Sequence, residues 1–207
     1  MTSMREPDEA AVAASGETDV DALRAATYRL LARFLAAPPD AGALLVASRL
    51  GEPETELGRA LSLFARIAAA TLPAQAAEEY HELFIGVGRG ELVPYGSFYR
   101  TGFLNEKPLA LLREDLAELG IARAADNPEP EDHIASLCEV MAGLAEGRFG
   151  ETGLATQQRF FDRHLAPWAG RFFADLEAAR AARLYQPLGT VGRLFVEIER
   201  TGFALAA

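Results

Sequence analysis

The stretch "NPEPEDHIASLCEVMAGLAEG", residues 127–147, predicts a helix that starts at a cluster of acidic residues next to a histidine. Asn127 suits the N-cap, Pro128 suits the first helical turn, and Gly147 suits the C-terminal end. Acidic side chains near the first turn also agree with the direction of the helix dipole. Between these ends, apolar side chains recur at the three- and four-residue steps of one buried helix face. That face consists of Ile134, Leu137, Cys138, Met141 and Leu144.

The same periodicity continues through most of the chain. Besides 129–147, helices are expected over residues 18–35, 40–50, 54–70, 73–84, 107–119, 151–165, 167–182 and 187–202. No segment alternates apolar and polar residues as a half-buried strand would. The sequence therefore predicts an all-α fold, a single globular multi-helix bundle of about eight to ten helices. Residues 1–17 lack periodicity and are predicted to be a disordered N-terminal tail, so that the helical domain covers 18–207.

Repeated glycines interrupt the helical pattern in "IGVGRGELVPYGSFYRTG", residues 85–102. This segment is predicted to be an ordered loop whose backbone turns sharply and can present its N–H and C=O groups to a partner. A dinucleotide-binding fingerprint would need its third glycine one place later, a strand before it and a helix after it. The glycines therefore give no support for nucleotide binding.

The composition is that of an ordinary soluble globular protein, with 50% hydrophobic residues and a formal net charge of −10. This negative charge repels a phosphate backbone, so nucleic acid is not an expected partner. No apolar run approaches the roughly 20 residues that a bilayer requires, and membrane insertion is not expected. Cys138, the single cysteine, excludes an internal disulfide and fits a reducing compartment. We expect a cytoplasmic protein.

Adjacent Asp132 and His133 invite a catalytic interpretation, but the rest of a catalytic site is missing from the pattern. Cys138 lies on the apolar helix face, which suits a buried thiol better than a nucleophile. Ser97 follows no strand and lacks the flanking glycines of a nucleophile elbow. A hydrolase is therefore not expected, and the pattern predicts no catalytic residue and no cofactor.

A metal-dependent helical-bundle oxidoreductase is the main alternative. Glu78, His81 and Glu82 have the spacing of half a di-iron signature on a helix. The second Glu-x-x-His that such a site needs is absent, since Pro130 and Phe161 occupy the places three residues before the other two histidines. A solvent-exposed helix face is the simpler interpretation of these three residues, and no metal ligand is predicted.

Two regions fit no enzyme template: the aromatic segment from Tyr80 to Tyr99 and the acidic helix start at 129–133. Aromatic side chains on a structured loop beside carboxylates suit recognition of a peptide that has an apolar segment and basic residues. In the alternative, structural interpretation, Tyr80, Phe84, Phe98 and Tyr99 belong to the core and Asp132 caps a helix. The spacing alone slightly favours this structural interpretation.

Three ordered motifs carry a resemblance to a known family. They are "YHELFIG" (Tyr80 to Gly86), "VPYGSFY" (Val93 to Tyr99) and "EPEDHIA" (Glu129 to Ala135). In this order, and followed by "HLAPW" and "LYQPL", they resemble the TorD/DmsD family of redox-enzyme maturation chaperones. The resemblance covers nearly everything from residue 20 to the C-terminus, although Tyr95 stands where that family often has tryptophan.

The resemblance implies an all-helical cytoplasmic chaperone without a catalytic role. Its partner would be the precursor of a molybdenum-cofactor oxidoreductase, bound through its twin-arginine signal peptide or as apoenzyme and held for cofactor insertion before export. A related alternative is an assembly factor for a molybdoenzyme that is not exported. A monomer or a domain-swapped dimer would agree with the family. Which oxidoreductase is the client does not follow from the sequence.

The resemblance also implies a peptide-binding surface made by the loop and the helix start. Its expected residues are Tyr80, Phe84, Pro94, Tyr95, Gly96, Ser97, Tyr99, Glu131, Asp132 and His133. Asp132 and Glu131 would pair with guanidinium groups of the leader, because carboxylates match the fork of arginine. His133 would add a hydrogen bond or a pH-dependent step, since a helix N-terminus disfavours its protonated form. These roles require the two regions to share one concavity.

Overall fold

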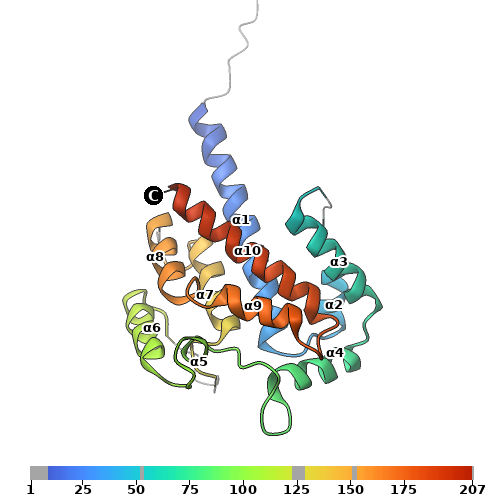
Figure 1. Cartoon of the computed structure of the whole chain (residues 1–207). Coiled ribbons are helices and arrows are strands. Elements are labelled where there is room, and N and C mark those ends of the chain that lie inside the picture. Colours follow the sequence, from blue (N-terminus) through green and yellow to red (C-terminus); the bar gives the residue numbers. More distant parts are fainter. Residues whose placement is uncertain (1–8, 52–53, 123–128, 151–152, 207) are drawn as a thin grey trace, which may run out of the picture.

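The computed structural model describes residues 9–51, 54–122, 129–150 and 153–206, and over these residues the chain is an all-α bundle without a β-strand (Figure 1). The helices are α1 (Glu9–Ala36), α2 (Ala41–Ala47), α3 (Glu56–Ala70), α4 (Pro73–Tyr80), the π-helical turn η1 (His81–Ile85), α5 (Gly96–Thr101), α6 (Lys107–Glu118), α7 (Ile134–Ala145), α8 (Leu154–His164), α9 (Ala169–Ala178) and α10 (Tyr185–Ala206). The predicted fold class is confirmed.

The boundaries of several helices follow from signals in the sequence. Asp40 caps α2 by accepting a hydrogen bond from Ala43 N at 2.7 Å, and Pro73 occupies the first position of α4. Gly120 and Gly147 follow α6 and α7 with left-handed φ angles of 69° and 66°. These ends lie where the glycine and proline signals predict them.

The N-terminal helix differs from the prediction. Helix α1 begins at Glu9, so residues 9–17, predicted to belong to a disordered tail, are helical. Alanine and glutamate are frequent in this segment, and both favour a helix even where no apolar face requires one. Residues 1–8 of the predicted tail lie outside the described residues.

The core is formed chiefly where α1 packs on α7 and where α10 packs on α9 and α3. Its largest buried side chains include Trp168, Tyr28, Tyr185, Phe34, Phe64 and Phe172. Two polar links tie distant parts of the chain through this core. Arg24 on α1 donates to both carboxylate oxygens of Glu199 on α10, at 2.7 and 2.9 Å. Glu79 on α4 accepts from the backbone N–H groups of Arg183, Leu184 and Tyr185 at the start of α10.

The segment predicted as one loop, 85–102, is more structured than expected. Its second part forms the short helix α5, which the sequence analysis missed because a six-residue helix is too short to show periodicity. The first part is a projecting loop after η1 (green, beyond α4 in Figure 1). At its base, Leu92 N donates to Leu83 O at 2.8 Å, and Gly86 has a φ of 61°. A Cβ on Gly86 would lie 2.2 Å from Arg89 O, so the predicted sharp turn requires glycine here.

Candidate functional site

The predicted loop and the predicted helix start lie side by side. Tyr95 and His133 form an isolated antiparallel β-bridge. Two backbone hydrogen bonds of 2.9 Å flank it, from Gly96 N to Asp132 O and from Ile134 N to Pro94 O. Because the bridge fixes these segments against each other, side chains from both can line one cavity.

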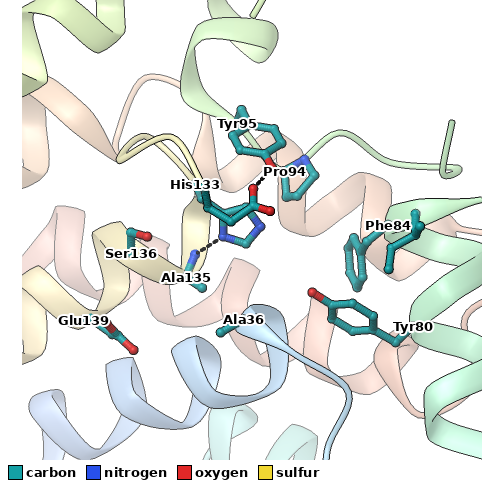
Figure 2. Close-up of a pocket in the computed structure, with 11 residues that line it drawn as sticks. Ala36, Tyr80, Phe84, Pro94, Tyr95, His133, Ala135, Ser136 and Glu139 are labelled. Atoms are coloured by element: carbon teal, nitrogen blue, oxygen red, sulfur yellow. Dashed lines mark hydrogen bonds between the residues drawn. The ribbon is translucent and has the colours of Figure 1, made fainter. Parts of the chain in front are cut away.

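A pocket of about 190 Å³ opens beside this bridge (Figure 2). It is lined by Ala36, Tyr80, Phe84, Ile85, Pro94, Tyr95, Glu129, His133, Ala135, Ser136 and Glu139. The two regions singled out in the sequence therefore share one concavity. Of the ten predicted site residues, Tyr80, Phe84, Pro94, Tyr95 and His133 line it.

The two sides of the pocket differ in chemistry. Figure 2 shows Ser136 and Glu139 of α7 on one side and Tyr80 and Phe84 on the opposite side. Rings of Tyr80 and Phe84 lie 5.0 Å apart between their centroids, and both also contact the ring of Tyr185. One side thus offers a carboxylate and a hydroxyl, and the other offers aromatic surface.

His133 forms the N-cap of α7. Its Nδ1 accepts a hydrogen bond from Ala135 N at 3.1 Å, and its ring meets the ring of Tyr95 edge-on at a centroid distance of 5.1 Å. Burial lowers the pKa of His133 to about 4, against the opposing influence of Glu129 and Asp132. The expected preference for the neutral form is present, but its main cause is burial and not the helix dipole.

The tyrosines of the pocket make polar contacts at their hydroxyl groups. Tyr95 donates to a carboxylate oxygen of Glu129, and burial together with this contact raises the pKa of Tyr95. Tyr80 donates to Leu35 O at 3.3 Å, and burial raises its pKa to about 12. Both therefore remain neutral at pH 7 and act as hydrogen-bond donors with aromatic bodies.

Asp132 is buried and contacts the start of α5 rather than the start of α7. Its side chain is only 3% exposed, and Oδ2 accepts a hydrogen bond from Ser97 N at 2.6 Å, at the start of α5. It neither caps α7, which His133 does, nor lines the pocket. An expected pairing of Asp132 with a guanidinium of the leader does not fit this position, because the carboxylate points into the protein and holds α5.

Gly96 and Ser97 also anchor the loop from behind the pocket. A Cβ on Gly96 would lie 3.0 Å from Nε1 of Trp168, so the absence of a side chain allows the indole to pack directly on the backbone. Ser97 is completely buried.

The expected N-cap Asn127 and the expected first-turn Pro128 lie outside the described residues, and α7 begins later, at Ile134.

Glu131 and Tyr99 lie away from the pocket. Glu131 accepts hydrogen bonds from Arg113 on α6 at 2.8 and 3.0 Å. Tyr99 donates to Asp175 at 3.0 Å and packs on Trp168 with 5.4 Å between ring centroids. For Tyr99 the alternative interpretation, a core-packing residue, agrees with these contacts.

The residues of the metal alternative do not converge. Glu78, His81 and Glu82 are exposed on α4 and η1, while the buried glutamate of this helix is Glu79. Among the described residues, no group of three or more histidine, cysteine, aspartate or glutamate side chains is placed to hold a metal ion.

Six residues of the pocket are not among the ten expected site residues, namely Ala36, Ile85, Glu129, Ala135, Ser136 and Glu139. Ser136 and Glu139 follow His133 at three-residue steps, so helical spacing places them on the same side of α7 and offers a signal for them. Ala36 gives no such signal, because the end of α1 reaches the pocket only through the packing of α1 on α7.

No single described helix is both long and apolar enough to cross a membrane. Helix α3 and the segment Pro73–Ile85 meet the length and composition criteria only as a pair, bent by 116°.

Comparison with known proteins identifies one family and several related chaperones. Residues 48–174 match the family described as nitrate reductase delta subunit. Chaperone protein TorD of Vibrio cholerae is 28% identical over 132 residues, covering 60% of this chain and 60% of that protein. The probable Tat proofreading chaperone DmsD of Haemophilus influenzae is 34% identical over 113 residues, covering 54% and 53%. The chain thus spans between half and two thirds of the length of these curated relatives.

A solved structure shares the fold. The crystal structure of a putative redox enzyme maturation protein from Archaeoglobus fulgidus superposes with a TM-score of 0.55 at 20% identity, over 84% of this chain and 93% of that one. The sequence match, which covers more than half of the chain, establishes the relationship itself. This protein belongs to the nitrate reductase delta subunit family, which includes the TorD and DmsD chaperones.

Proposed function

We propose that this protein is a cytoplasmic chaperone, without catalytic activity, for the precursor of a molybdenum-cofactor oxidoreductase. It binds the twin-arginine leader, the apoenzyme or both, and holds the precursor for cofactor insertion before export. The relatives support this class, since they are named as chaperones, and DmsD specifically as a Tat proofreading chaperone.

The observation that carries the proposal is the pocket between the Tyr95–His133 bridge and the α4–η1 segment. It combines aromatic surface with the carboxylates of Glu129 and Glu139, on a protein whose net charge is −10. A leader peptide offers the complementary pair of features, arginine side chains next to an apolar stretch. Carboxylates and aromatic surface can bind these two parts of a peptide, and binding of this kind involves no chemical reaction.

The predicted peptide-binding residues divide into two roles in this proposal. Contacts with the peptide come from Tyr80, Phe84, Pro94, Tyr95 and His133. Gly96, Ser97 and Asp132 act indirectly, because they hold the loop in the position that shapes the pocket. Tyr99 and Glu131 do not line the pocket and make no contact with the peptide in this proposal, since Tyr99 packs on Trp168 and Glu131 accepts from Arg113.

Affinity purification from native cells growing anaerobically, followed by mass spectrometry, tests the proposal. We expect a molybdoenzyme precursor with its leader intact to be retained by the wild-type protein. The matched control is a variant with Phe84→Ser and Tyr95→Ala, which alters the pocket while leaving the buried anchors Asp132 and Trp168 in place. Retention of a molybdoenzyme that has no leader would favour the assembly factor for a non-exported enzyme. Retention of no molybdoenzyme by the wild-type protein would contradict the function.

A further inference from the structure

We propose that the pocket fixes the placement of the bound peptide, with an arginine on the α7 side at Glu139 and the following apolar stretch across η1 toward Val87. This inference rests on the proposed function and adds which residues read each part of the peptide. Neither Glu139 nor Val87 belongs to the motifs that carry the family resemblance.

The α7 side has the chemistry for a guanidinium group. Glu139 lines the pocket and is exposed, and it forms no ion pair with any other described residue. Ser136 lies one helical turn before it on the same wall. Glu129 adds a second carboxylate at the rim, where the hydroxyl of Tyr95 orients it. A planar fork of N–H donors can satisfy such separated oxygen acceptors better than a compact ammonium group can.

The opposite side continues as an apolar path out of the pocket. Phe84 and Ile85 line the cavity, and Ile85 remains 54% exposed. Two residues further, Val87 is fully exposed in the loop that follows η1. The loop is well fastened, since Leu92 N and Glu91 N bond back to η1 and the guanidinium of Arg89 lies 4.8 Å from the centroid of the Phe98 ring. Exposed valine on a fastened loop is available to cover an apolar segment.

The size of the cavity limits what can enter it. About 190 Å³ is smaller than the roughly 300–1,000 Å³ of pockets that enclose a drug-sized ligand. It suits one long side chain, so the remainder of the peptide has to lie on the adjoining surface. Because Glu139 lies on the α7 side and the apolar side chains of Phe84 and Ile85 belong to η1, only one placement of an arginine-plus-apolar peptide matches both sides.

Double-mutant cycles between protein and peptide test this placement. The probe is a synthetic fluorescent peptide with two adjacent arginines followed by a stretch of leucine and alanine. One variant peptide has glutamines for the arginines, and another has serine and glycine for the apolar stretch. Fluorescence anisotropy gives the Kd of each peptide for the wild-type protein, Glu139→Gln, Val87→Ser and the control Glu197→Gln. Glu197 is an exposed glutamate of α10 that does not line the pocket.

We expect Glu139→Gln to weaken binding of the arginine peptide about two- to fivefold and to leave binding of the glutamine peptide unchanged. Val87→Ser should weaken binding of both of these peptides by roughly threefold, and should have no effect on the peptide without the apolar stretch. Glu197→Gln should change none of the affinities. Both test positions are exposed, so the variants are expected to fold as the wild type does.

The failures of the two proposals are distinguishable. If the wild-type protein binds the arginine peptide, but Glu139 couples to the apolar stretch or to neither part, the placement is overturned and the function stands. If the wild-type protein binds the arginine peptide no better than a peptide of scrambled sequence, both proposals are overturned.

Discussion

Asp132 and His133 are neighbours in the chain and both are buried, yet their side chains have different roles. His133, with Tyr95 and Glu129, forms what we term the pocket face of the bridge. Asp132, with Gly96 and Ser97, forms what we term the anchoring face, which packs toward Trp168. Asp132 lies in a turn that His133 N closes by donating to Pro130 O at 3.2 Å, whereas His133 itself has extended backbone angles, so one dipeptide contributes to both faces.

This contrast separates residues that shape the site from residues that touch its contents. On the anchoring face, substitutions should cost stability first and binding only as a consequence. On the pocket face, substitutions should change binding or the pH dependence of stability, while the fold persists at neutral pH. Four substitutions test the division.

Asp132→Ala should have the largest effect, a loss of about 3 kcal/mol in the free energy of unfolding. The substitution removes the acceptor of the Ser97 N–H, which is then left without a partner in the interior, and buried bonds to charged groups contribute about 1.5–3 kcal/mol. Equilibrium urea unfolding at pH 7 measures it. The control Glu131→Ala removes a carboxylate at a partly exposed ion pair and should cost less than about 1 kcal/mol. Equal losses in the two variants would contradict the anchoring role.

His133→Asn should remove a pH dependence of stability. The pKa of His133 falls from 6.5 in the unfolded chain to about 4 in the folded protein, so between these values the unfolded state binds more protons and acid favours unfolding. This contribution to stability is complete above pH 6.5 and is lost as the pH falls toward 4. At pH 5 the loss is about 2 kcal/mol relative to pH 7.

Unfolding curves of the wild type and of His133→Asn at both pH values isolate this contribution. Asparagine retains an acceptor for the N-cap of α7, and His164 titrates in both proteins and cancels in the difference. Parallel loss of stability in the two proteins on acidification would show that His133 is not the group responsible.

Gly96→Ala should destabilise the fold by about 1 kcal/mol. The new methyl group would lie 3.0 Å from Nε1 of Trp168, which is closer than packed atoms tolerate without a shift. Thermal unfolding gives the change. The matched control is Gly202→Ala on α10, where a Cβ meets nothing within 4 Å and alanine should stabilise the helix. If both substitutions stabilise the protein, the packing of the Trp168 indole does not require glycine at position 96.

Tyr95→Phe should have the smallest effect on stability, within about 0.5 kcal/mol, because the lost hydroxyl bonds to an exposed carboxylate at the rim. Affinity for the arginine peptide should fall about two- to fivefold, since Glu129 loses the group that orients it. Anisotropy and urea unfolding on the same preparation measure both. A loss of stability larger than that of Gly96→Ala would place Tyr95 among the anchoring residues.

The fold could be predicted to a large extent because its signals are local. Helical periodicity, the cap at Asp40, the proline at the start of α4 and the glycines after α6 and α7 each act over a few residues. Two helical segments were not predicted. Helix α5 is too short to show periodicity, and the start of α1 depends on helix propensity without an apolar face.

The site could be predicted only in part. The motifs located both segments, and five of the expected residues line the pocket. The position of Asp132 could not be predicted, because an acidic residue near a helix start gives the same pattern whether its carboxylate faces solvent or a backbone N–H of another segment. Glu139 lies on the same helix side as His133, yet without the position of α1 and η1 nothing distinguishes it from any exposed glutamate.

By itself, the sequence determined the all-helical class, several helix ends and the two segments of the site, because helix formation, capping and sharp turns depend on interactions between residues close in the chain. Only the tertiary structure decided which neighbour of the Asp132–His133 pair faces the pocket and which faces the core. That choice depends on a backbone bridge between residues 95 and 133, and on Trp168 and Ser97 behind it, which are contacts between segments far apart in the sequence.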